Sequence, residues 1–281
     1  MKILLVNKYL YRKGGAETYF IKLGEYLKSL GNEVEYFGMA DERNCVGNRV
    51  EAYTENIDFH KKSLKYITYP FKIIYSINAR KQIRKVLSDF KPDVVHLNNF
   101  NYQLTPSIIY EIKKHNIPIV YTAHDVQLVC PNHKLKNDYT DGLCRKCDGG
   151  KYFECVKNNC VHSSKIRSIL GAVEAWYYKL RHTYKMIDLT VCPSEFMEKE
   201  ISRNDDINGR TVTMYNFIDE IKPLGAECEN YVLYFGRYSE EKGISNLVKA
   251  AKKLSNIPFV FAGKGELENE VNSADNIKNI G

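Results

Sequence analysis

The sequence lacks any apolar run long enough to cross a membrane. Its longest apolar segments, such as residues 3–6 and 231–235, have the length of strands. The first of them follows Met1 almost directly, without the apolar core and small-residue cleavage site of a signal peptide. The 281 residues are 44% hydrophobic and 27% charged, which is ordinary for soluble globular domains. We therefore expect a cytoplasmic protein with one large or two ordinary domains.

Short apolar strands alternate with helices along most of the chain. Strands are predicted at residues 2–6, 34–37, 92–97, 118–122 and 189–192, and helices at residues 16–30, 105–115 and 163–186. Such alternation is typical of parallel βαβ units in a doubly wound sheet. The predicted fold class is therefore α/β.

Two segments interrupt this pattern. Residues 126–162 show no helical or strand periodicity and are predicted to be a cysteine-rich insertion. Residues 219–230 are polar and are predicted to be a linker. Strand 231–235, helix 244–254 and strand 258–262 then begin a second Rossmann-like domain. We expect an N-terminal domain at 1–218 and a C-terminal one at 219–281. The second is expected to be incomplete, because a doubly wound sheet has five or six strands over roughly 100–150 residues.

The sequence has no G-x-G-x-x-G fingerprint, which argues against a nicotinamide or flavin dinucleotide. It has instead Gly14 and Gly15 in the loop after the first strand, where open α/β sheets bind ligands. Two glycines would let the backbone approach a ligand, and the following helix offers free N–H groups to an anion. A plain strand-to-helix turn explains the same residues equally well.

His124 and Asp125 come just after the strand at 118–122. At the carboxyl end of a strand they are well placed to hydrogen-bond sugar hydroxyls, and His124 could also steady developing charge. The alternative is a buried histidine that only satisfies its own hydrogen bonds. The shared edge with the Gly14 and Gly15 loop favours a catalytic role.

The first strand of the second domain is followed by Gly236, Arg237 and, five residues later, Lys242. Arg237 could bind a diphosphate with two hydrogen bonds, and Lys242 at the helix start supplies a point charge. Together they could neutralise a departing nucleoside diphosphate without a metal ion. Gly265 follows the next strand and would lie near the nucleotide. The competing interpretation is two solvated surface cations.

In this order the motifs resemble the GT4 family of retaining glycosyltransferases. The resemblance covers nearly the whole chain and also includes the turn at 193–194 and residues 216–219. It implies a GT-B fold, in which two Rossmann-like domains with parallel sheets face a cleft. The N-terminal domain then takes the acceptor and the C-terminal domain takes the nucleotide-sugar, here with Asn216 among the donor-binding residues.

Matched to that family, Gly15 resembles the loop glycine beside the donor phosphates, and His124 the histidine at the donor sugar. Arg237 and Lys242 resemble its diphosphate-binding pair. The family's two glutamates, seven residues apart, have no counterpart in this sequence. We therefore expect little or no activity from this stretch of chain alone. A front-face mechanism is usual for the family, and no carboxylate stands out as a covalent nucleophile.

The eight cysteines are concentrated in the insertion. In a reducing compartment such a cluster more often binds metal than forms disulfides. Four thiolates within seventeen residues could build a structural zinc site, from Cys144, Cys147, Cys155 and Cys160. Free thiols, disulfides and another metal remain open. No cofactor is expected for catalysis.

Residues 60–85 contain eight Lys or Arg and no Asp or Glu. With aromatic residues among the cations, this stretch suits a helix on an anionic bilayer that reaches a lipid-linked acceptor. An ordinary solvated helix with its aromatics toward the core is the equal alternative. The first interpretation places the enzyme at the inner face of the plasma membrane.

The leading hypothesis is a hexosyl or glycosyl transferase that builds a cell-envelope polysaccharide or a lipid-linked glycan. A nucleotide-sugar epimerase of the same fold is the first alternative. A zinc-dependent nucleic-acid-binding protein is the second, based on the cysteines and the basic stretch, and it is disfavoured because those features occupy one insertion and one segment. We expect no nucleic-acid partner.

Overall fold

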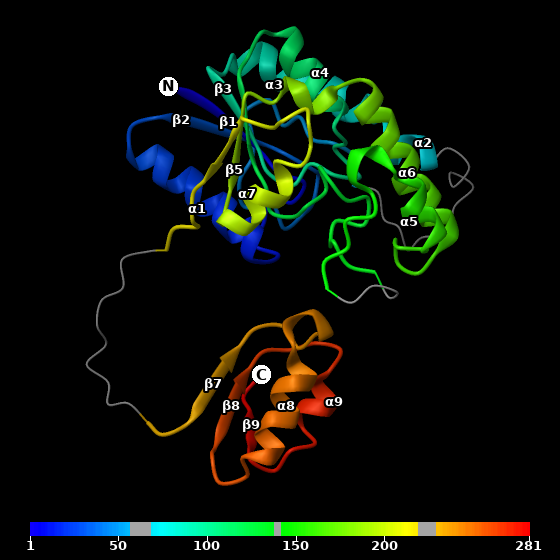
Figure 1. Ribbon diagram of the computed structural model, residues 1–281. Coiled ribbons are helices and arrows are strands. Elements are labelled where there is room, and N and C mark those ends of the chain that lie inside the picture. Colours follow the sequence, from blue (N-terminus) through cyan, green and yellow to red (C-terminus); the bar gives the residue numbers. More distant parts are fainter. Residues whose placement is uncertain (57–68, 138–141, 219–228) are drawn as a thin grey trace. The chain divides into compact units, whose positions relative to one another are not determined.

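The computed structural model describes residues 1–56, 69–137, 142–218 and 229–281. Contacts within the chain divide it into two compact units, Met1–Ile218 and Asp219–Gly281 (Figure 1). Within the described ranges, none of the helices is both long and apolar enough to cross a membrane.

The N-terminal unit is built on a six-stranded sheet in which every neighbouring pair is parallel. The strands, in the order β2-β1-β3-β4-β5-β6 across the sheet, are β1 (Lys2–Val6), β2 (Glu33–Phe37), β3 (Val94–Leu97), β4 (Ile119–Thr122), β5 (Leu189–Cys192) and β6 (Thr211–Thr213). The predicted parallel α/β sheet is confirmed. β6 had not been predicted, because three residues of Thr-Val-Thr carry almost no strand signal.

Helices connect these strands. They are α1 (Gly15–Ser29), α2 (Tyr69–Ile74), α3 (Ile77–Phe90), α4 (Ser107–Lys114), α5 (Phe153–Lys157), α6 (Lys165–Leu180) and α7 (Glu195–Ile201), with short 3-10 turns η2 (Asp148–Gly150) and η3 (Thr183–Met186). The prediction of one helix over residues 163–186 is wrong in its extent. His182 adopts a left-handed backbone with φ of 48°, which ends α6 and lets η3 begin.

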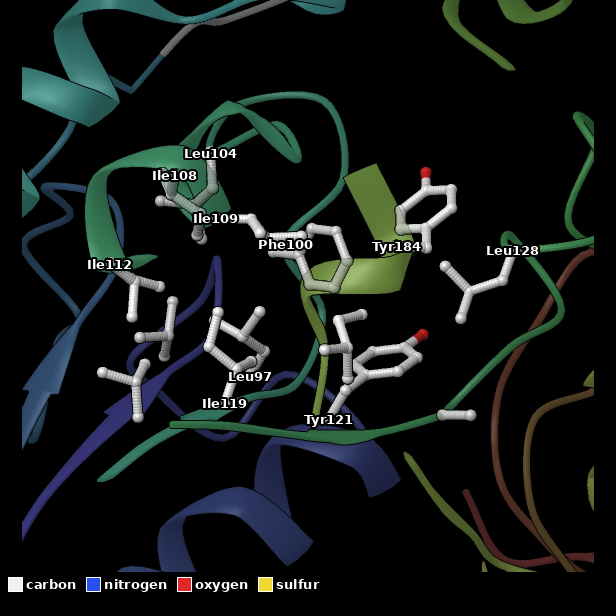
Figure 2. Packing of buried hydrophobic residues seen from close by; sticks show 14 of the residues in the cluster. Leu97, Phe100, Leu104, Ile108, Ile109, Ile112, Ile119, Tyr121, Leu128 and Tyr184 are labelled. Atoms are coloured by element: carbon white, nitrogen blue, oxygen red, sulfur yellow. The ribbon is translucent and has the colours of Figure 1, made fainter. Parts of the chain in front are cut away.

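Side chains of β1 point alternately to the two faces of the sheet, and each face is covered by helices. Leu4 and Val6 belong to one apolar cluster, while Ile3 and Leu5 belong to another that includes Phe20 of α1. Figure 2 shows part of the first cluster, in which α4 and the loop before it pack over β3 and β4 through Leu97, Phe100, Leu104, Ile108, Ile109, Ile112, Ile119 and Tyr121. Layers on both faces are what a doubly wound fold requires.

The basic helix α3 also packs into this core. Its N-cap, Ser76, accepts a hydrogen bond from the backbone N–H of Ala79 at 3.1 Å. The apolar residues recur at helical spacing, and the buried ones are Ala79, Ile83, Val86, Leu87 and Phe90. The cations occupy the remaining face, so this part of the basic stretch is an ordinary amphipathic helix of the domain.

The C-terminal unit has three parallel strands in the order β7-β8-β9. Its elements are β7 (Val232–Phe235), the 3-10 turn η4 (Glu240–Lys242), α8 (Ile244–Lys253), β8 (Phe259–Ala262), α9 (Glu268–Val271) and β9 (Ile277–Asn279). Phe259 and Phe261 of β8 form a core with Ile244 and Val248 of α8. Within the described residues β7 is an edge strand, and its Phe235 side chain is 79% exposed.

Candidate active site

The loops that follow β1, β3 and β4 meet at the carboxyl edge of the six-stranded sheet. From β1 the chain runs to β2 on one side, whereas β3 lies on the other side of β1, so the loops diverge there and leave room for a ligand. Hydrogen bonds tie the loops together. Asn7 accepts from the backbone N–H of Asn99 at 3.0 Å, and Lys8 Nζ donates to Asn101 Oδ1 at 2.8 Å.

His124 lies at this edge in a defined orientation. Its Nε2 is 2.9 Å from Oδ1 of Asn98, and the Tyr19 ring packs against the imidazole in a T-shaped arrangement with centroids 5.5 Å apart. Because the partner is a carbonyl oxygen, Nε2 carries the proton and Nδ1 is left as an acceptor. Burial lowers the pKa of His124 to about 4, although the charge of Asp125 opposes this. The imidazole is therefore neutral at physiological pH.

A second neutral histidine lies behind it. His96 Nε2 is 2.7 Å from Oγ1 of Thr122, and burial, with a smaller contribution from His124, lowers the pKa of His96 to about 4. Sequence analysis missed Asn98 and His96. His96 lies near the end of the predicted strand 92–97, and Asn98 follows that strand. The rule that identified His124, that polar residues at the carboxyl end of a strand lie where ligands bind, could therefore have found both.

Asp125 turns toward His133 of the cysteine-rich insertion. Its Oδ2 is 3.3 Å from His133 Nδ1, and its Oδ1 accepts the backbone N–H of Gln127 at 2.9 Å. Burial would raise the pKa of Asp125, but the hydrogen bond and charge of His133 hold it below its usual value. Asp125 is thus an ionised partner of His133, a residue that the sequence analysis had not placed in the active site.

The start of α1 is open at the same edge. A Cβ added to Gly15 would meet nothing within 4 Å, and one added to Gly14 would meet only a Glu17 oxygen at 3.4 Å. Packing of the described residues therefore does not require glycine at either position. The free space is compatible with the predicted close approach of a ligand to this helix terminus.

The end of the N-terminal unit returns to α1. Phe217, next to the predicted donor-binding residue Asn216, packs on Tyr19 with ring centroids 5.2 Å apart and on Tyr26 at 6.3 Å. Because Tyr19 also touches His124, the segment that carries Asn216 comes back to the neighbourhood of the candidate catalytic histidine.

In the C-terminal unit the predicted residues follow β7 and β8. Arg237 and Lys242 are exposed, and Arg237 Nη2 lies 2.9 Å from Glu241 Oε1. Gly236 has φ of 144°, a backbone that favours glycine. Gly265 has a packing reason of its own, since an added Cβ would lie 2.3 Å from the carbonyl oxygen of Tyr238. These contacts neither require nor oppose diphosphate binding.

The cysteines of the insertion gather around one small hollow. Cys130 lines it together with the four predicted ligands Cys144, Cys147, Cys155 and Cys160. Burial, followed by the neighbouring thiols, raises the pKa of Cys147 to about 12. The insertion also packs on α6, where the indole N–H of Trp176 donates to the carbonyl of Gly150 at 2.9 Å.

Across the described residues, no three or more His, Cys, Asp or Glu side chains are grouped so that they could hold a metal ion. Structural zinc at Cys144, Cys147, Cys155 and Cys160 stays a prediction. Metal analysis of the purified protein is expected to find one zinc per chain, and removal of zinc by a chelator should loosen the insertion. Folded, metal-free protein with thiols that react freely would contradict it.

The predicted membrane stretch at 60–85 is only partly visible, because residues 57–68 lie outside the described ranges. Tyr75 stacks on Tyr110 with centroids 6.4 Å apart, and Arg80 and Arg84 both bind Glu111. These side chains are engaged within the protein. Lys81 and Lys85 remain exposed on α3.

Comparison with known families gives two matches. A family model described as "Glycosyltransferase Family 4" matches residues 13–221, and one described as "Glycosyl transferases group 1" matches residues 217–280. An uncharacterized 42.6 kDa protein in the cps region of Klebsiella pneumoniae is 25% identical over 280 residues, which cover 94% of this chain and 68% of that protein.

Solved structures share the fold at low sequence identity. Anabaena HepE in complex with UDP and glucose aligns with a TM-score of 0.57 and 16% identity, over 100% of this chain and 69% of its own. Sucrose-phosphate synthase from Thermosynechococcus elongatus aligns with a TM-score of 0.62 and 14% identity, over 100% and 70%. These likenesses confirm the predicted GT-B type of fold.

Proposed function

Because the chain belongs to glycosyltransferase family 4 and has the GT-B fold, we propose that it moves a sugar from a nucleoside-diphosphate sugar to a glycan acceptor, with retention. The observation that carries this proposal is the neutral His124, held by Asn98 at the carboxyl edge beside α1. The UDP and glucose in the HepE structure support a nucleotide-sugar donor.

In the proposed reaction, His124 binds the donor sugar. Its Nδ1, left free by the Nε2 bond to Asn98, accepts a hydrogen bond from a sugar hydroxyl and steadies the positive charge that develops on the ring. A neutral imidazole suits this task better than a cation, which would repel that charge. Asp125 keeps its neighbour His133 in place and, as the partner of that residue, is a poor candidate for a covalent nucleophile.

Transfer then proceeds on one face of the sugar. The bond from the anomeric carbon to the diphosphate oxygen breaks, and the acceptor oxygen forms its bond to the same carbon on the same face. The acceptor proton goes to the departing phosphate oxygen. Arg237 and Lys242 neutralise the charge of the nucleoside diphosphate, so the step needs no catalytic metal.

We propose a surface polysaccharide or lipid-linked glycan precursor as the acceptor. The relative in the cps region of Klebsiella pneumoniae supports a link to that gene region. We also propose that Lys81 and Lys85, which are exposed on α3, contact an anionic membrane and bring the enzyme to the inner face of the plasma membrane.

In a form of the enzyme that turns over its nucleotide-sugar, replacing Arg237 or Lys242 by alanine is expected to lower that turnover at least about tenfold each, which corresponds to about 1.4 kcal/mol. The matched control is Lys249→Ala, an exposed lysine of α8. Product analysis with and without glycan acceptors measures the effect and also distinguishes transfer from epimerisation, which needs no acceptor. Near-normal rates in both variants would show that the diphosphate binds elsewhere.

A further inference from the structure

The outer face of α6 is a continuous row of exposed apolar side chains. The row consists of Ile166, Ile169, Val173, Trp176 and Leu180, which recur at alternating steps of three and four residues. This spacing places all five along one narrow side of the helix, here called the apolar stripe. The helix packs on the domain through a different side, where Ser168, Ala172 and Tyr178 are buried. Single exposed apolar residues are ordinary, but a contiguous row indicates a surface that something else covers.

The stripe is most exposed at its two ends. The side chains of Ile166 and Leu180 are 73% and 80% exposed, which is unusual for large aliphatic residues in a helix that packs on a domain. No part of the protein's own core uses these two side chains, since neither belongs to an apolar cluster of the described residues. Substituting them should therefore leave the fold intact.

The neighbouring helix α5 extends the same surface. Both α5 and α2 lie against α6 (Figure 1). Phe153 of α5 is exposed, and the ring of Tyr152 before it lies 6.4 Å from that of Trp176. The indole N–H of Trp176 is satisfied by a backbone carbonyl, while the ring stays exposed. Tryptophan with an apolar ring and a satisfied N–H is enriched where proteins meet the membrane–water interface.

Positive charge surrounds the stripe. Residues 151–185 contain seven Lys or Arg and only two acidic residues, Glu154 and Glu174, both of which are partly buried. Lys165 and Arg167 are exposed at one end of the stripe and form no ion pair within the described ranges. Arg181 is exposed at the other end. Any molecule that covers the stripe therefore meets cations at both of its ends.

This charge argues for an anionic surface and against a second copy of the chain. Two α6 helices packed along their stripes in opposite directions would bring Lys165 and Arg167 of one copy close to Arg181 of the other. Packed in the same direction, they would bring each cation close to its own counterpart. Like charges repel in both arrangements. An anionic bilayer complements the cations and also takes up the apolar side chains between them.

We propose that the apolar stripe of α6, together with Phe153, inserts into the headgroup region of an anionic lipid bilayer. The helix lies in the plane of the membrane, and the cations at its two ends contact the lipid headgroups. The inference goes beyond sugar transfer and does not depend on it. It also names a surface different from Lys81 and Lys85 of α3, for which a contact by charge alone is proposed.

The test is flotation of the whole chain with lipid vesicles in a density gradient. The vesicles contain phosphatidylglycerol and phosphatidylcholine in equal parts, or phosphatidylcholine alone, and we expect binding to the anionic vesicles to be at least about tenfold tighter. Ile166→Gln combined with Leu180→Gln should weaken that binding at least about tenfold, because it removes exposed apolar side chains at unchanged net charge. Lys165→Gln combined with Arg167→Gln should independently weaken it about tenfold.

Leu30→Gln is the matched control, because it makes the same change at a leucine that is 60% exposed at the end of α1, and it should have no effect. A thermal melt shows that each variant folds. Lys81→Gln combined with Lys85→Gln tests the contact proposed for α3. Loss of vesicle binding in that variant but not in Ile166→Gln with Leu180→Gln would show that α3 carries the contact and would overturn the inference.

Three other results would also overturn the inference. They are equal binding to neutral vesicles, no binding to either kind, and a dimer in sedimentation velocity that only Ile166→Gln with Leu180→Gln dissociates. The last result would identify the stripe as an interface between copies. Failure of the proposed sugar transfer would leave the flotation result unchanged, since no nucleotide-sugar enters the assay.

Discussion

His124→Ala is expected to reduce nucleotide-sugar turnover about 100-fold or more while leaving the fold intact. Removing one preorganised group that stabilises transition-state charge typically costs a factor of this size. The imidazole contacts Asn98 and Tyr19 but belongs to neither large apolar cluster, so its loss should cost little stability. The measurement is the steady-state rate together with a thermal melt.

Three further measurements sharpen this prediction. His115→Ala, at the exposed C-terminal end of α4, is the matched control and should have wild-type activity. Asn98→Ala should lower turnover through a loosely held imidazole and is expected to fall between the control and His124→Ala. Because the pKa of His124 is lowered to about 4, this histidine should cause no change in activity between pH 6 and 8. A loss in that range that disappears in His124→Ala would contradict a neutral role.

Glu111→Ala is expected to destabilise the N-terminal unit by about 3 kcal/mol. The Glu111 side chain is 1% exposed, and it accepts hydrogen bonds from Arg80 at 2.8 Å and from Arg84 at 2.6 Å. Truncating it would leave two guanidinium groups of α3 without their counter-charge, one of them largely buried. Urea denaturation measures the loss. The exposed Glu33, 3.9 Å from Lys2, is the control, and Glu33→Ala should cost under about 1 kcal/mol.

The pH dependence of this effect has a definite sign. Hydrogen bonds from Arg84, followed by those from Arg80, lower the pKa of Glu111 to about 2, below its ordinary value of 4.5. The stabilisation is therefore complete above pH 4.5 and is lost as the pH falls toward 2. Wild type and Glu111→Ala should converge in stability as the solution is acidified. A difference that stays constant down to pH 2 would show that packing, not charge, accounts for the loss.

Much of the fold could be predicted because buried parallel strands are continuous apolar runs bounded by glycine, proline and polar turn residues. β1 and β5 were predicted to the residue for this reason. The sequence left α3 open between a membrane-facing segment and an ordinary amphipathic helix, and its burial in the core could be decided only from the tertiary structure. The break after α6 depends on the left-handed backbone of His182, a position without the glycine that usually marks such an end.

The candidate site also has residues that the sequence could predict and residues that it could not. Residues at the loops that follow the strands, such as Gly15 and His124, could be found because topology brings the ends of parallel strands together. His133 lies in an insertion without periodicity, so no sequence rule pointed it toward Asp125.

The packing of the insertion on α6 also supplies an optical probe. Trp176 is the only tryptophan in the sequence, and its indole N–H is held by the carbonyl of Gly150. Light at the red edge of aromatic absorption excites this one ring and none of the tyrosines. Its emission wavelength therefore reports on a single place, where the cysteine-rich insertion meets α6. Loosening of the insertion can be followed there without a label.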